Sequence, residues 1–284
     1  MDSMYRVALQ GTNPKPFVAM TVAGSDSGGG AGIQADLKTF AALGVYGTST
    51  VTAVTAQNTV GVRQAVELPV EIIASQFDAI VEDIGVDAAK TGMLSSAAII
   101  ETVAAKAEEH RLKKLVVDPV MIAKSGDRLL REDAVSALAR RLIPLADVVT
   151  PNLQEAEALV GFPVRDPASM RRAAKAIVEM GAGAAVVKGG HAEGEEAVDL
   201  MFDGTGFHEF RAPRVVTRNT HGTGCTFSAA IAAFLARGES VVGAVELAKV
   251  YLTRALERGV SIGKGHGPVE HFAGATLWQA SRRG

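Results

Sequence analysis

The chain has 284 residues, which is enough to bury a large core in one domain. A hydrophobic fraction of 48% and a charged fraction of 21% exclude a disordered chain, and the net charge of −2 argues against nucleic acids and other polyanions as partners. The single cysteine excludes an intramolecular disulfide and indicates a reducing compartment, which we expect to be the cytoplasm.

The N-terminus lacks a basic segment followed by a long apolar run, so we expect no signal peptide. The sequence also lacks a stretch of about 18 apolar residues, so we expect no membrane span. Residues 1–15 have no hydrophobic periodicity and contain Gly11 and Pro14, which predicts a loose N-terminal extension.

The first ordered unit combines a strand, a glycine-rich loop and a helix. The apolar run 17–23 predicts a buried strand, the loop 24–32 holds several glycines, and residues 33–43 have helical spacing. Such a unit opens a wound α/β sheet, in which ligands bind beyond the carboxyl ends of the strands. The glycine spacing matches neither a dinucleotide fingerprint nor a Walker loop, so we expect this loop to line a substrate pocket.

Strand and helix patterns then alternate along the chain. They predict strands at 48–59, 62–69, 86–94, 115–121, 146–150 and 184–191, a hairpin over 197–202 and 207–210, and helices at 70–83, 96–110, 132–142, 167–180 and 241–258. Because no linker or repeat interrupts them, we predict one domain over residues 16–284. Its expected architecture is three-layer α/β/α, with a mostly parallel central sheet flanked by helices.

The stretch from Asn219 to Ser228 is rich in glycine and threonine, and apolar residues in helical register follow it up to Ala236. Glycine allows a backbone to turn sharply near a ligand, and the next helix directs its free N–H groups and positive dipole end into the loop. This predicts an anion hole with Cys225 at its mouth. An ordinary glycine turn before a core helix is the alternative interpretation.

Six residues lie at or just after the ends of predicted strands, and they are Gln57, Met93, Asp118, Asn152, Glu155 and Lys188. Ends of parallel strands share one rim, so these residues can converge on one pocket. Asp118 and Glu155 can hold Mg²⁺, partly through water, while a lysine and loop amides can hold phosphate. The combination indicates phosphoryl transfer. Each residue also has an ordinary interpretation, such as a helix cap at Asn152 and Glu155, a turn at Asp118, an exposed strand end at Lys188, or core packing at Met93.

The chain resembles the hydroxymethylpyrimidine/phosphomethylpyrimidine kinases, a thiamine-biosynthesis family of the ribokinase superfamily, from Phe17 to Phe272. The runs that carry the resemblance are Gly32–Phe40, Ala56–Thr59, Lys90–Leu94, Val117–Met121, Thr150–Asn152, Lys188–His191 and Asn219–Thr226. The resemblance implies a ribokinase-like fold and a homodimer. It also implies a kinase that uses ATP and Mg²⁺ to phosphorylate 4-amino-5-hydroxymethyl-2-methylpyrimidine, and then its monophosphate to the diphosphate.

The resemblance also implies roles for individual residues. The expected pyrimidine pocket consists of Gln57, which reads the ring edge, with Gly24, Ala31, Asp36, Met93 and Val120. The expected ATP-binding residues are Asn152, Lys188, Thr220, Gly222, Gly224 and Lys249, with Asp118 and Glu155 at the metal. The expected catalytic group is Cys225, Lys188, Gly222, Thr223 and Gly224. For Lys249, a surface position on a helix is the alternative.

Cys225 departs from the wider superfamily, in which sugar and nucleoside kinases usually have an aspartate base at this position. This departure matches the pyrimidine kinases and the related pyridoxal kinases. A thiol beside glycine amides at a helix N-terminus is expected to have a lowered pKa, so Cys225 could deprotonate the substrate hydroxyl or merely orient it. An inert buried thiol is the alternative.

Two other functions remain open at this point. A pyridoxal or pyridoxine kinase on the same scaffold would also act on a flat nitrogen ring with a hydroxymethyl group. A non-catalytic pyrimidine-binding protein would keep the pocket, although Asp118, Glu155, Lys188 and the intact glycine loop argue against it.

Overall fold

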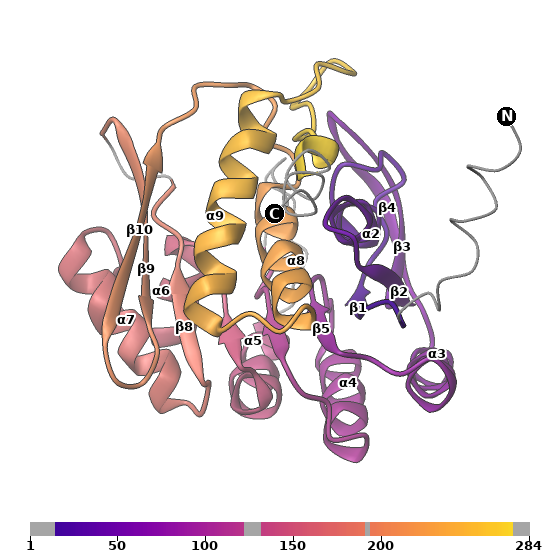
Figure 1. Ribbon diagram of the computed structural model, residues 1–284. Coiled ribbons are helices and arrows are strands. Elements are labelled where there is room, and N and C mark those ends of the chain that lie inside the picture. The colour runs from indigo at the N-terminus through magenta and orange to yellow at the C-terminus, as the bar shows by residue number, and fades with distance from the viewer. Residues whose placement is uncertain (1–14, 122–131, 191–193, 275–284) are drawn as a thin grey trace, which may run out of the picture.

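The computed structural model describes residues 15–121, 132–190 and 194–274, and within them eight strands form one sheet (Figure 1). The strand order is β10-β9-β8-β7-β6-β5-β1-β2. The six strands β8, β7, β6, β5, β1 and β2 are parallel, and β9 pairs antiparallel with both β8 and β10. The strands are β1 (Val18–Ala23), β2 (Tyr46–Val51), β5 (Ala88–Thr91), β6 (Leu115–Val117), β7 (Val148–Val149), β8 (Ala184–Val187), β9 (Glu196–Phe202) and β10 (Phe207–Pro213). The predicted mostly parallel sheet is confirmed.

Helices cover both faces of the sheet, because the buried strands carry apolar side chains on both sides. Val116 of β6 packs with Phe227 on one face, whereas Leu115 and Val117 pack with Ile99 on the other. One face holds α2 (Gly32–Ala42), α8 (Thr223–Ala236) and α9 (Val241–Glu257). The other holds α3 (Val70–Asp83), α4 (Ala97–Glu109), α5 (Glu132–Ala137), α6 (Leu153–Val160) and α7 (Pro167–Glu179). The predicted three layers are therefore confirmed.

Helix α8 lies at the centre of its layer, between α2 and α9 (Figure 1). Every residue from Thr226 to Ala236 is buried. A helix that is apolar on all sides requires such an enclosed position. The glycine loop before α8 is therefore held at a fixed place at the rim of the sheet.

The prediction of one strand over residues 48–59 is wrong at Thr52. Strand β2 ends at Val51, and β3 (Ala53–Asn58) leaves the main sheet to pair antiparallel with β4 (Gly61–Glu67). At the break, the Thr52 hydroxyl donates to the Met93 carbonyl. Continuous β-branched residues favour strand on both sides of Thr52, so composition alone does not reveal the change of partner.

Strands β5, β6, β7 and β8 are shorter than predicted, and the segments after them carry several of the expected site residues. Asp118 follows β6 directly and Lys188 follows β8 directly. The predicted helix at 132–142 is α5 followed by a π-helical turn, Leu138–Leu142, and short 3-10 turns occur at Ile143–Leu145 and His271–Gly274. Residues 1–14 of the expected extension and His191 of the expected strand lie outside the described residues. Among the helices of the described ranges, none combines the length and apolarity needed to cross a bilayer.

Candidate active site

Neighbouring strands bring the predicted charged residues together at one rim. Lys188 pairs with Asn152 across an isolated parallel bridge, and its N–H donates to the Pro151 carbonyl at 2.8 Å. Its ammonium Nζ lies 3.0 Å from Asp118 Oδ1 and 3.9 Å from Glu155 Oε2. The sequence prediction that Asp118, Asn152, Glu155 and Lys188 converge agrees with this geometry.

Helix α8 begins directly beside this charged group. Gly222 is its N-cap with a φ of 78°, a left-handed conformation that favours glycine. A Cβ added to Gly224 would lie 3.5 Å from Lys188 Nζ and 3.7 Å from Asp118 Oδ2. Thr223 closes the loop by donating from its hydroxyl to the Thr220 carbonyl at 2.7 Å. The Thr223 N–H donates to the Thr220 carbonyl, so the N–H groups of Gly224 and Cys225 are left to open next to the half-buried Lys188 cation. This is a suitable site for phosphate.

Asp118 is almost fully buried, and several side chains engage its two oxygens. Oδ1 accepts from Lys188 and from the Thr150 hydroxyl at 3.3 Å, and Oδ2 accepts from the Ser228 hydroxyl at 3.2 Å. Burial alone would lower the pKa of Lys188, but the charges of Asp118 and Glu155 outweigh burial and raise it. Lys188 is therefore a permanent cation at this rim.

Glu155 and Asn152 form a capping box at the start of α6, so the capping interpretation is correct for both. Glu155 Oε2 accepts the Asn152 N–H at 2.7 Å, and Asn152 Oδ1 accepts the Glu155 N–H at 2.9 Å. Burial raises the pKa of Glu155 to about 7, with Lys188 opposing and Asp118 reinforcing the shift. A carboxyl group that titrates near neutral pH is readily ionised by a cation placed beside it.

The oxygen atoms available as metal ligands at this rim fit a magnesium ion. Asp118, Glu155 and Asn152 present oxygen atoms, which are the ligands that Mg²⁺ prefers. The oxygens of Asp118 already accept hydrogen bonds from Lys188, Thr150 and Ser228, so contact through water is more compatible with this arrangement than a full set of direct bonds.

The predicted pyrimidine-pocket residues come from several loops around the end of β1. A Cβ added to Gly24 would lie 2.2 Å from Met93 Cε, so Gly24 and Met93 are in close contact. The Gln57 backbone is joined to the glycine loop because its N–H donates to the Ser27 hydroxyl at 2.8 Å. Ala31 caps α2, and its N–H donates to Asp26 at 2.8 Å. Val120 follows Asp118 and is half-buried.

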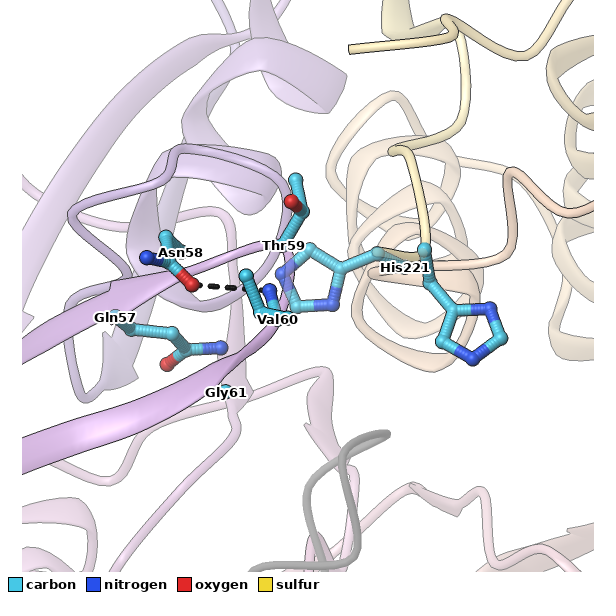
Figure 2. A pocket seen from close by; sticks show the side chains of 7 residues that line it. Gln57, Asn58, Thr59, Val60, Gly61 and His221 are labelled. Atoms are coloured by element: carbon cyan, nitrogen blue, oxygen red, sulfur yellow. Dashed lines mark hydrogen bonds between the residues drawn. The ribbon is translucent and has the colours of Figure 1, made fainter. Parts of the chain in front are cut away.

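Gln57 also lines the hollow drawn in Figure 2. Its wall is formed by the turn between β3 and β4 and by two histidines from the C-terminal third of the chain. The lining residues are Gln57, Asn58, Thr59, Val60, Gly61, His221 and His266.

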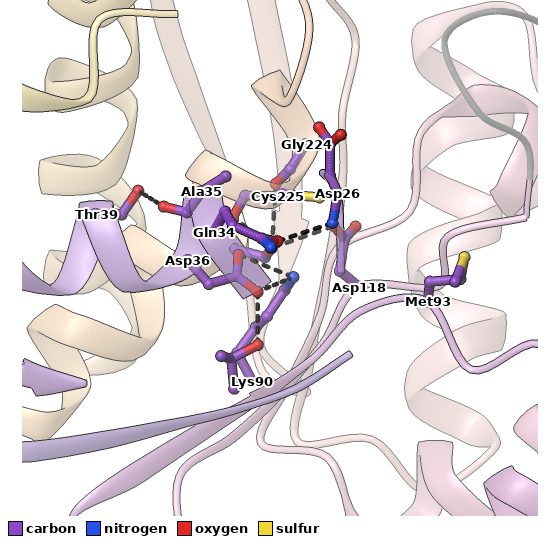
Figure 3. A network of polar contacts seen from close by, with 12 residues as sticks. Asp26, Gln34, Ala35, Asp36, Thr39, Lys90, Met93, Asp118, Gly224 and Cys225 are labelled. Atoms are coloured by element: carbon purple, nitrogen blue, oxygen red, sulfur yellow. Dashed lines mark hydrogen bonds and ion pairs between the residues drawn. The ribbon is translucent and has the colours of Figure 1, made fainter. Parts of the chain in front are cut away.

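Asp36 is fully buried, whereas a residue that contacts a ligand is normally open to its pocket. Its side chain and that of Lys90 have 0% exposure, and the two charged groups lie 2.9 Å apart. The Thr21 hydroxyl donates to the same carboxylate at 2.6 Å. Figure 3 shows this buried pair in the same region as Cys225 and Asp118. Asp36 therefore joins α2 to β5, and its expected place in the pyrimidine pocket stays a prediction.

The expectation of a lowered pKa at Cys225 is wrong. Burial raises the pKa of the thiol to about 11, the Lys90 charge opposes this shift, and the Asp36 and Asp118 charges add to it. A hydrogen bond from the Gly32 backbone also lowers this pKa, but it does not offset burial beside these two carboxylates. At neutral pH Cys225 is a protonated thiol.

Lys249 is buried, so the alternative of a surface lysine is wrong. Its ammonium lies 2.7 Å from Asp199 Oδ2 in β9, and Asp199 Oδ1 accepts the N–H of Gly189 at 2.9 Å. Lys249 thus supports the segment that carries Lys188. Its expected contact with the ATP base stays a prediction.

The structure brings further residues into the site that no sequence pattern identified, among them Asp26, Lys90, His221 and Ser228. Ser228 follows Cys225 by one helical turn, which is a spacing that could have identified it. Asp26 and His221 each lie within a glycine loop that is visible in the sequence. Lys90 sits in a strand, where the sequence pattern contains no sign of its partner on α2.

Comparisons with known proteins agree with this geometry. A model of the phosphomethylpyrimidine kinase family matches residues 26–270. The hydroxymethylpyrimidine/phosphomethylpyrimidine kinase of Rhizobium meliloti is 55% identical, over 90% of this chain and 97% of that protein. The thiamine biosynthesis bifunctional protein ThiED of Geobacter sulfurreducens is 52% identical over 95% of this chain, and this chain spans 56% of its length.

Among solved structures, the pyridoxal kinase of Bacillus subtilis in an ADP complex superposes with a TM-score of 0.85. Its sequence is 41% identical to this one, over 91% of this chain and 98% of that chain. This likeness confirms the expected ribokinase-like fold.

Proposed function

Because the chain belongs to the phosphomethylpyrimidine kinase family, we propose that it phosphorylates the hydroxymethyl group of 4-amino-5-hydroxymethyl-2-methylpyrimidine. The resulting monophosphate is its second substrate, and the diphosphate is its final product. ATP is the phosphoryl donor, Mg²⁺ is the cofactor, and the reaction serves thiamine biosynthesis.

The observation that carries this proposal is the contact between the charged rim and the start of α8. Lys188 lies 3.0 Å from Asp118 Oδ1, and Gly224 adjoins both residues. A transferred phosphoryl group held there would meet a fixed cation and a set of free N–H donors. Charge stabilisation and positioning of this kind provide most of the catalysis of phosphoryl transfer.

In the proposed reaction, different residues bind the phosphoryl group, the nucleotide and the metal ion. Lys188 and the amides of Gly222 and Gly224 bind the transferring phosphoryl group, and Thr223 holds the loop that presents them. Asn152, Thr220 and Lys249 belong to the proposed nucleotide side of the site. When bound, Mg²⁺ would neutralise phosphate charge, and Asp118 and Glu155 would hold it.

On the substrate side, we assign the pyrimidine edge to Gln57 and the walls of its pocket to Gly24, Ala31, Met93 and Val120. Asp36 supports this side of the site from within the core. Cys225, with its protonated thiol, orients the substrate hydroxyl rather than deprotonating it.

A turnover assay with Mg·ATP and two ring substrates tests the proposal. We expect kcat/KM for the hydroxymethylpyrimidine to exceed that for pyridoxal, and we expect the pyrimidine monophosphate to be a substrate. A preference for pyridoxal would favour the second candidate, a pyridoxal kinase, which the 41% identity to the Bacillus subtilis enzyme supports. Pyrimidine binding without turnover would favour a binding protein and contradict the proposal.

We also propose that residues 16–284 act as one cytoplasmic kinase domain that forms a homodimer. Val54 and Val66 lie opposite each other in β3 and β4 and are 50% and 55% exposed. A two-stranded hairpin is marginally stable alone in water, so a second copy could cover this face. Light scattering should give a dimer for the natural chain and a monomer for Val54→Lys. A monomeric natural chain would contradict the homodimer.

A further inference from the structure

Asp26 organises the glycine loop that follows β1. Its carboxylate accepts the backbone N–H groups of Gly28 at 2.8 Å, Gly30 at 3.1 Å and Ala31 at 2.8 Å. Burial would raise the pKa of Asp26, but His221 and these N–H groups outweigh burial and lower it. Asp26 is therefore an anion that holds this loop in shape from inside.

The same carboxylate reaches the second glycine loop, which precedes α8. Nε2 of His221 donates to Asp26 Oδ2 at 2.8 Å, and the two side chains are 11% and 2% exposed. The loops also touch through their glycines. A Cβ on Gly30 would lie 2.4 Å from the His221 ring, and a Cβ on Gly222 would lie 1.8 Å from the Gly30 carbonyl oxygen. The position of one loop therefore determines the position of the other.

The backbone of His221 is joined to a third segment near the C-terminus. Its N–H donates to the Gly267 carbonyl at 3.0 Å, and its carbonyl accepts from Val269 at 3.4 Å. In the same segment, the His266 N–H donates to the Thr59 carbonyl at 3.1 Å, close to Gln57. His221 thus lies between the pocket side and the phosphate side of the site.

We propose that Asp26 and His221 are a positioning pair that fixes the anion-hole loop against the loop lining the pyrimidine pocket. The proposal rests on the proposed function, because it concerns the alignment of the substrate hydroxyl with the phosphoryl group. Neither side chain needs to touch the reacting atoms. An error of about 1 Å in such an alignment can cost on the order of 10²-fold in rate.

Two substitutions at His221 test the pair, and the chain offers a matched control. His221→Phe keeps a ring but removes the donor, whereas His221→Gln keeps a donor of similar reach. His208 of β10 donates to Asp203 at the same 2.8 Å, so His208→Phe breaks a more exposed pair of the same length away from the site.

For His221→Phe we expect a fall in kcat on the order of 10²-fold, with little change in KM for the pyrimidine. We also expect weaker calorimetric binding of Mg·AMP-PCP, because the amides of the anion hole are displaced. His221→Gln should recover most of both losses, and His208→Phe should match the unmodified protein. If His221→Phe and His221→Gln had the same kcat and the same affinity for Mg·AMP-PCP, whether both normal or both impaired, the proposal would be overturned.

If His221→Phe does not fold, Gly30→Ala replaces it in the same comparison, because a Cβ there pushes the ring away without deleting a polar group. If the unmodified protein does not turn over the pyrimidine, the proposed function fails. The AMP-PCP comparison still decides the positioning pair in that case.

Discussion

The Lys188 side chain has two roles in the site. It neutralises the buried Asp118, and it presents positive charge to the loop before α8. The carboxylate also has Thr150 and Ser228 as donors, so it keeps hydrogen bonds even without the lysine. A Lys188 variant therefore needs separate measurements of turnover and of stability, because the lysine contributes to both.

For Lys188→Met we expect a fall in kcat on the order of 10²–10³-fold, the usual effect of removing one group that stabilises transition-state charge. The melting temperature should fall as well, because the buried Asp118 keeps two hydroxyl donors but loses its charge partner. Steady-state kinetics and calorimetry measure the two quantities, with the exposed Lys113→Met as the control. Wild-type turnover would mean that Lys188 is merely a strand end.

The protonated thiol of Cys225 predicts a modest kinetic role. Cys225→Ala should lower kcat by less than about tenfold, whereas loss of a general base costs about 10²–10⁴-fold. Because the pKa of the thiol is raised to about 11, iodoacetamide should react slowly at pH 7 and faster as the pH rises. Rapid alkylation at neutral pH, with protection by the pyrimidine, would restore the thiolate base that the sequence suggested.

Gln57→Leu keeps the side-chain volume and removes both the donor and the acceptor. If Gln57 reads the ring edge, kcat/KM for the pyrimidine should fall by about 10²-fold or more, because buried polar partners become unpaired. Binding of Mg·AMP-PCP should be unchanged in calorimetry. Retention of pyrimidine affinity would exclude this role for Gln57.

At the scale of elements, α8 has a left-handed glycine at each end, and the two ends serve different purposes. Gly222 begins the helix with a φ of 78°, and Gly238 follows its last turn with a φ of 94°. A Cβ on Gly222 would collide with the Gly30 carbonyl oxygen, whereas a Cβ on Gly238 would meet nothing within 4 Å. The N-terminal glycine therefore serves the site, and the C-terminal glycine serves only the turn.

Gly222→Ala and Gly238→Ala should differ accordingly. Gly238→Ala should lose about 1–2 kcal/mol of unfolding free energy, because a left-handed conformation is unfavourable for alanine. Gly222→Ala should lose more stability than that, and its kcat should also fall, because the Cβ separates the two loops. Urea unfolding and steady-state kinetics measure both effects. Equal kinetics for the two variants would show that the loop contact is dispensable.

At the scale of the whole molecule, the pair Asp36–Lys90 ties a helix of one layer to the middle of the sheet. Asp36 lies on α2 and Lys90 on β5, and both are inaccessible to solvent. A buried ion pair of this kind is weak evidence for stability, because desolvation offsets the attraction between the charges. Removal of one partner, however, leaves an uncompensated charge in the core.

Replacement of one partner and of both should therefore have opposite outcomes. Lys90→Met and Asp36→Leu should each lose about 3–5 kcal/mol of unfolding free energy, whereas the double variant should recover most of that loss. Urea unfolding measures this difference. If turnover stays low in the stable double variant, the pair also positions the site. A double variant as unstable as the single ones would mean that the charges themselves are required.

Local patterns in the sequence were sufficient for the layered fold, the glycine loops and the group Asp118, Asn152, Glu155 and Lys188. Periodicity reveals which residues are buried, and residues at the ends of parallel strands meet at one rim whatever the details of packing.

The tertiary structure alone decided which groups pair across the core and which protons they hold. His221 and Asp26 are 195 positions apart, and Lys249 meets Asp199 across two layers. Pairing at such separations depends on topology, which local periodicity does not contain. The sign of the pKa shift at Cys225 was misjudged for the same reason, because desolvation and the charges of Asp36, Lys90 and Asp118 act through space rather than along the chain.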